Sequence, residues 1–158
     1  MSTSTSKKAL VLRFDREPLP GFVNPQNFAT PSGIELLTPQ GQVQILPFSE
    51  VKLVCFVKDF ADSPNVFEKR QFAARPKTLG LWIRLKFRDG EMLEGLLSSN
   101  LLQIEQFGFT VAPPDPTLQR IFVPRSALTD LDVLGVIGSA LKKSRARPVS
   151  QDQLQMFE

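Results

Sequence analysis

Four residues close to the end of the chain have types and spacing that suit binding. Gln153, Leu154, Met156 and Phe157 combine an amide that can hydrogen-bond with three apolar side chains. An aromatic anchor beside adaptable methionine and leucine side chains is a common composition for a protein-binding hot spot. The preceding polar segment, residues 142–152, has little to bury and predicts a flexible tether. We therefore predict a docking peptide, with packing of the same side chains onto the chain's own core as the open alternative.

The order Gln-Leu-x-Met-Phe over residues 153–157 resembles the short peptide with which bacterial replication and repair proteins bind the DNA sliding clamp. The resemblance implies that Gln153 hydrogen-bonds at the rim of a pocket. It implies also that Leu154, Met156 and Phe157 supply the apolar contacts within the cleft. The expected partner is therefore another protein.

A second chemical feature of the tail is its positive charge. Lys142, Lys143, Arg145 and Arg147 lie in a segment without acids, and the whole chain has a net charge of +3, so the remainder is close to neutral. A near-neutral body lacks the broad basic surface of a protein that follows a phosphate backbone. The basic cluster is therefore expected to be a solvated linker, with contact to nucleic acid or to an acidic partner as the alternative.

The sequence contains few of the side chains that catalysis usually requires. The chain has no histidine and no tyrosine, and it lacks the glycine-rich motifs that hold phosphate groups. Its carboxylates gather in predicted turns beside arginines, where solvated charge is expected: Asp15, Glu17, Asp89, Glu91 and Glu94. The lone Cys55 lies in an apolar run and is expected to be a core residue. We predict a protein that is not an enzyme and that needs no cofactor or metal.

No run of the sequence approaches the roughly 18 apolar residues that a membrane span needs. The first eight residues lack the apolar stretch of a secretory signal. The sequence therefore predicts a cytoplasmic protein.

The body of the chain contains a tandem duplication. Residues 9–14 match residues 82–87, since in both the alternation of apolar and polar residues ends at phenylalanine before a charged turn. Residues 45–54 match residues 122–131, each around a Pro-x-Ser step. Glycine-led stretches beginning at Gly33 and Gly108 correspond as well, and their offset of 75 residues lies between those of the other two pairs.

Each repeat has five short stretches of period-two apolarity, which predict a small, strongly bent antiparallel sheet. Closing such a sheet on itself removes its exposed edges. This order of elements resembles the Sm-like or SH3-like small barrel. It lacks the Asp-x-apolar-x-Asn segment and the Arg-Gly pair with which Sm proteins read RNA, so the resemblance does not imply RNA binding.

The predicted architecture is all-β, with two tandem five-stranded small barrels. The first unit covers residues 7–58 and the second residues 79–135, with a connector at 59–78 and a basic tail at 136–158. Residues 66–73 of the connector are expected to form a helix of two turns that Phe67 and Phe72 hold against a barrel. A further short helix is expected over residues 133–146.

A second resemblance is to an uncharacterised family of bacterial proteins with paired β units, seen in residues 54–60 and 87–91. It implies an accessory module and brings no known activity. Two other functions stay open beside docking of the tail. One is binding of single-stranded nucleic acid through the basic cluster and the loop phenylalanines, which are Phe22, Phe28, Phe48 and Phe107. The other is self-association of the duplicated body.

Overall fold

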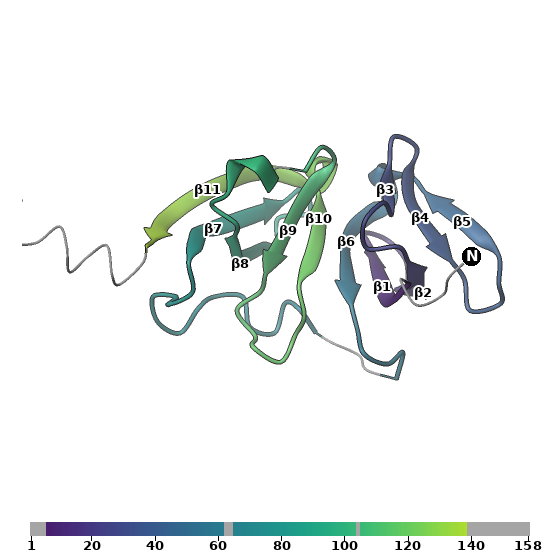
Figure 1. The fold of residues 1–158 in the computed structure, drawn as a ribbon, viewed down its shortest axis with the longest axis horizontal. Helices are drawn as coiled ribbons and strands as arrows, with labels where there is room; N and C mark the ends of the chain where they lie inside the picture. The colour runs from purple at the N-terminus through teal and green to yellow at the C-terminus, as the bar shows by residue number, and fades with distance from the viewer. Residues whose placement is uncertain (1–5, 62–64, 104, 139–158) are drawn as a thin grey trace, which may run out of the picture.

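The computed structural model describes residues 6–61, 65–103 and 105–138, which form a single all-β body (Figure 1). Within these ranges the regular structure consists of strands and three short 3₁₀ turns, and the predicted all-β class is confirmed. The same residues include no helix of the length and apolarity that a membrane crossing requires.

The two halves of the chain present matching series of strands. The first series is β1 (Lys7–Arg13), β2 (Leu19–Val23), β3 (Ala29–Thr30), β4 (Gly33–Leu37), β5 (Val43–Leu46), the turn η2 (Phe48–Glu50) and β6 (Val51–Phe56). The second is β7 (Gly80–Phe87), β8 (Met92–Leu97), the turn η3 (Leu101–Gln103), β9 (Gly108–Ala112), β10 (Ile121–Pro124), the turn η4 (Arg125–Ala127) and β11 (Leu128–Ile137). In each half a 3₁₀ turn at the Pro-x-Ser step leads into the last strand, as the repeat predicts.

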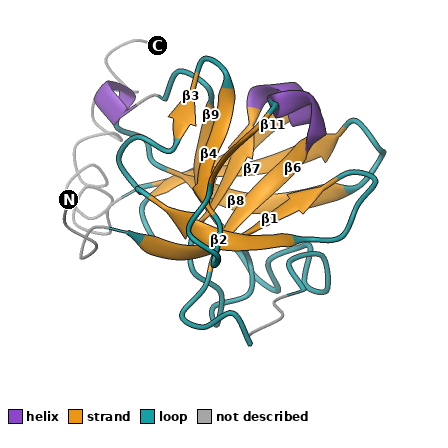
Figure 2. Ribbon diagram, turned by 90° about the vertical axis from the view of Figure 1, so that its right-hand side faces the viewer, coloured by secondary structure: helices purple, strands orange, loops and turns teal. Residues whose placement is uncertain are grey.

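The strands of each half pair in the same order, but they belong to one sheet. The first half pairs as β6-β1-β2-β4-β5 and the second as β11-β7-β8-β9-β10. Antiparallel pairing of β10 with β6 joins the halves into a continuous eleven-stranded sheet, which curls on itself (Figure 2). The two separate closed barrels that the sequence predicts are therefore not confirmed.

Close contacts at equivalent glycines show the duplication in three dimensions. A Cβ atom on Gly33 would lie 2.0 Å from the carbonyl oxygen of Leu46, and one on Gly108 would lie 2.3 Å from the carbonyl oxygen of Val123. In each half the glycine begins one strand, β4 or β9, and the carbonyl belongs to the matching residue of the next strand, β5 or β10. Glycine is required there because the two backbones approach too closely for a side chain.

Two apolar cores lie within the curled sheet, and β6 contributes to both. Leu53 and Cys55 pack in the core of the second half, whereas Val51 and Val54 pack in the core of the first. Phe122 of β10 likewise reaches into the first core. The strands that join the halves are therefore buried on both faces, and the halves share their cores across this seam.

Neither helix predicted from the sequence forms in the described residues. Residues 66–73 adopt turns and bends, although Phe67 packs against the second core as expected. The backbone of this connector makes one turn bond, from the N–H of Glu68 to the carbonyl of Asn65, and otherwise bonds to side chains and to β8. Residues 133–137 extend β11, because they pair with β7 around an irregularity between Val133 and Gly135. Gly135 therefore marks a bulge in a strand.

Candidate functional site

The residues that the sequence predicts to bind a partner all lie outside the described residues. They are Gln153, Leu154, Met156 and Phe157 of the docking peptide, with Lys142, Lys143, Arg145 and Arg147 of the basic cluster. The described body contains three other chemical features: a buried charge cluster, paired aromatic rings and two sheet edges.

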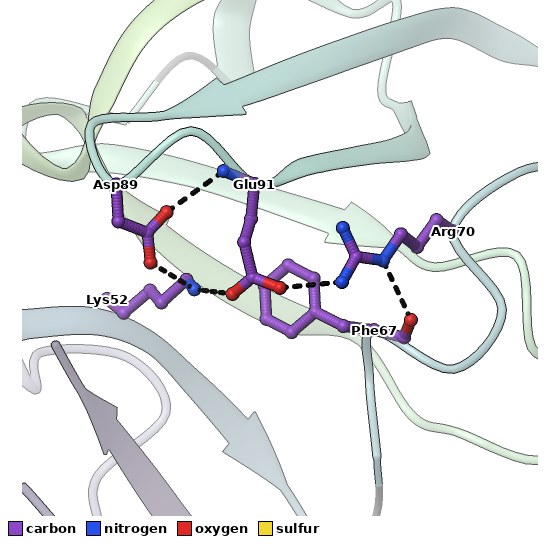
Figure 3. Close-up of polar contacts among 5 residues, drawn as sticks. All are labelled: Lys52, Phe67, Arg70, Asp89 and Glu91. Atoms are coloured by element: carbon purple, nitrogen blue, oxygen red, sulfur yellow. Dashed lines mark hydrogen bonds and ion pairs between the residues drawn. The ribbon is translucent and has the colours of Figure 1, made fainter.

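The charge cluster is centred on Lys52 of β6 and joins three segments that are distant in sequence (Figure 3). Lys52 is 6% exposed. Its Nζ lies 2.6 Å from Oδ2 of Asp89 and also donates to the carboxylate of Glu91, both in the turn between β7 and β8. Arg70 of the connector donates to the second oxygen of Glu91 at 2.7 Å. The cluster thus ties the first half and the connector to the second half.

Aromatic rings complete the surroundings of the Lys52 ammonium group. Its Nζ lies 4.3 Å from the ring centroid of Phe67, 5.3 Å from that of Phe87 and 5.8 Å from that of Phe14. A cation over an aromatic face is attracted by the ring quadrupole, most strongly where water is excluded. Two carboxylates and three rings therefore compensate for the removal of Lys52 from water.

The sequence-based expectation that these turn carboxylates form a solvated face is wrong for Glu94, whereas Asp89 and Glu91 stay about one third exposed and are ion-paired with Lys52. Glu94 is 9% exposed and accepts hydrogen bonds from the indole of Trp82 at 2.9 Å and from the backbone N–H of Phe72 at 3.2 Å. The expectation failed because the partners of all three carboxylates come from outside the repeat unit or from a neighbouring strand. Period-two patterns carry no signal for such pairings.

Asp89 has a lowered pKa as a result of this arrangement. Partial burial alone would raise the pKa of its carboxyl group. Hydrogen bonds from Lys52 and from the N–H of Glu91, together with the positive charge of Lys52, outweigh that effect and place the pKa below its ordinary value.

We expect the Asp89 contribution to stability to disappear in acid. A carboxyl group with a lowered folded-state pKa stabilises the fold fully above its unfolded pKa of about 4, and this contribution is lost as the pH falls through the folded-state pKa. The measurement is urea unfolding at a series of pH values, followed by emission of the single Trp82, for the wild type and Asp89→Asn. The difference between the two should shrink toward low pH. A difference that does not change with pH would show that ionised Asp89 contributes no stability.

The contacts of this cluster support a structural role. Its oxygens are occupied by Lys52, Arg70 and backbone N–H groups, and the described residues contain no group of three or more side chains suited to a metal ion. Cys55 is fully buried, as expected of a core residue, and burial raises its pKa to about 11. A thiol with that pKa is not an activated nucleophile.

The loop phenylalanines that could stack on nucleic-acid bases contact other rings instead. Phe22 meets Phe60 edge to face at 5.3 Å between ring centroids, and Phe28 meets Phe122 at 5.0 Å. The other two, Phe48 and Phe107, stack on each other at 5.6 Å across the halves. Two of these pairs therefore join the halves, and the Phe22–Phe60 pair joins the first half to the connector.

β5 and β11 form two edges of the sheet, and each has one partner among the described strands, as does the two-residue β3, which pairs with β4. β5 pairs with β4 alone and β11 pairs with β7 alone. Large apolar side chains are exposed on both: Val43 and Ile45 on β5, and Val133 and Val136 on β11. The sequence-based prediction missed these edges because it assumed closed barrels. The repeat could have revealed these edges, because β5 matches β10 and β11 matches β6, and β10 and β6 pair with each other.

Comparison with known proteins identifies one family. Residues 5–135 match the family described as "Family of unknown function (DUF6982)". No curated protein and no solved structure matches the chain. The match extends over both series of strands and agrees with the resemblance to an uncharacterised family seen in residues 54–60 and 87–91. The chain therefore belongs to this family of unknown function.

Proposed function

We propose that this protein is a non-enzymatic cytoplasmic interaction module whose β body carries a C-terminal docking peptide. The single observation that supports docking is the pattern Gln-Leu-x-Met-Phe at residues 153–157. Its proposed partner is the bacterial DNA sliding clamp. Gln153 would hydrogen-bond at the rim of the clamp's cleft, while Leu154, Met156 and Phe157 would bury their side chains there.

The body is proposed to be two fused Sm-like or SH3-like units. The repeated strand order, in which the last strand of each half pairs with the first, supports this proposal. The charge cluster around Lys52 supports a scaffold role, because its ionised groups bond to one another and stabilise the junction of the halves. In this view the body positions the tail and supplies no chemistry of its own.

The docking proposal is tested by binding of the intact chain to purified clamp. Calorimetry should give a dissociation constant on the order of micromolar, equivalent to about −8 kcal/mol. A peptide of residues 148–158 should bind comparably. Changing Met156 and Phe157 together to alanine should abolish binding, whereas Gln151→Ala, just outside the motif, should leave it unchanged.

Failure of both the intact chain and the peptide to bind the clamp would reject this partner. Affinity for single-stranded DNA that decreases steeply with salt would instead favour the nucleic-acid alternative through residues 142–147.

A further inference from the structure

The seam between the halves and the two outer edges of the sheet are built from equivalent strands. At the seam β10 of the second half pairs with β6 of the first half. β5 is the equivalent of β10 in the first half, and β11 is the equivalent of β6 in the second half. Neither has the corresponding partner among the described strands. They lie toward opposite ends of the body, so one chain cannot pair them with each other (Figure 1).

Equivalent residues differ in burial in the way that a missing partner predicts. Leu10 and Ile83 are matching positions of the repeat, so their partners Cys55 and Val133 are equivalent. Cys55 is fully buried, whereas Val133 is 55% exposed. The same holds on the other strand. Phe122 of β10 is 1% exposed, whereas its equivalent Ile45 is 49% exposed.

We propose that copies of this chain associate head to tail, with β5 of one copy pairing antiparallel with β11 of the next. The inner seam sets the register. There Ile121 lies opposite Cys55 and Phe122 opposite Val54. The same register between two copies places Gln44 opposite Val133 and Ile45 opposite Asp132. This pairing would cover both exposed side chains and extend the sheet across the junction.

The lengths of the free edges fit this pairing. β5 has four residues. Between its two irregularities β11 also offers a regular run, from Asp130 to Val133, and beyond it Arg75 of the connector already bonds the carbonyl of Val136. At the inner seam only two residues of the four-residue strand β10, Ile121 and Phe122, lie opposite residues of β6. The available edges are therefore longer than the paired stretch of the junction that the protein already makes.

In a head-to-tail interface each copy contributes two different surfaces, one on β5 and one on β11. A mixture of two variants, each blocked at one surface, therefore tests the interface directly. Ile45→Lys blocks the β5 surface and leaves β11 intact, while Val133→Lys does the reverse. Each variant alone is expected to be a single chain by sedimentation equilibrium. An equimolar mixture is expected to form a dimer with twice the mass, because one intact β5 and one intact β11 remain. The wild type is expected to reach at least twice the mass of one chain.

Controls separate this result from misfolding and from the docking peptide. Leu102→Lys alters a side chain that is 95% exposed but belongs to η3 and to neither edge strand, and it should leave association unchanged. Both lysine variants should keep the circular-dichroism spectrum of the wild type and unfold cooperatively, since both side chains are exposed in the single chain. The full chain with Met156 and Phe157 changed to alanine should still associate, so this test and the clamp test fail independently. A wild type that stays a single chain, lysine variants that still associate, or a mixture without a dimer would each overturn the proposal.

Discussion

Replacing Lys52 by alanine is expected to lower the free energy of unfolding by about 2–3 kcal/mol. Removing one partner of a buried ion pair typically costs about 3–5 kcal/mol, and the effect is smaller here because the carboxylates of Asp89 and Glu91 are about one third exposed. The substitution leaves Asp89 without its cation and Glu91 with Arg70 alone, and it removes the ammonium group from the face of the Phe67 ring. Urea unfolding followed by Trp82 emission measures the loss.

Two further variants separate the charge of Lys52 from its packing. Lys52→Met keeps an apolar chain against the rings and should recover part of the stability lost in the alanine variant. Lys86→Ala removes an exposed lysine from β7 and should change stability by less than about 0.5 kcal/mol. If Lys52→Ala were no more destabilising than Lys86→Ala, the cluster would contribute nothing to the junction of the halves.

Gly33→Ala is expected to destabilise the fold by about 3 kcal/mol or more. Gly33 has a φ of +135°, which L residues rarely adopt, and its added Cβ would lie 2.0 Å from the carbonyl oxygen of Leu46. Backbone strain and a core clash each cost about 1–3 kcal/mol, and here they act together. Thermal and urea unfolding of the purified variant measure the effect, with loss of folded protein as the extreme result.

Gly41→Ala is the matched control for this substitution. Gly41 also has a positive φ, +89°, but a Cβ there meets nothing within 4 Å. It should cost only the conformational strain, about 1–2 kcal/mol. Equal losses at the two positions would show that the close approach of β4 and β5 is not what requires glycine at position 33.

The all-β class, the duplication and the position of the turns before the last strand of each half could be predicted from the amino-acid sequence alone. Period-two alternation is a local property, and the repeated Pro-x-Ser step sets the 3₁₀ turn before β6 and β11 in both halves. The glycines Gly33 and Gly108 could be matched because a backbone that leaves no room for a Cβ excludes other residues at both places. Family membership followed from the same duplicated stretch.

The way in which the repeats are joined, and the partners of the buried charges, depend on long-range contacts that are visible only in three dimensions. Alternation shows which face of a strand is buried, but it does not show which edge meets which, so the pairing of β10 with β6 replaced the expected closed barrels. Lys52 and Asp89 are 37 residues apart, and their contact exists because that seam brings β6 beside the turn after β7. Residues 66–73 form turns because their backbone groups bond to Glu94 and to other parts of the connector, which local helix propensity does not include.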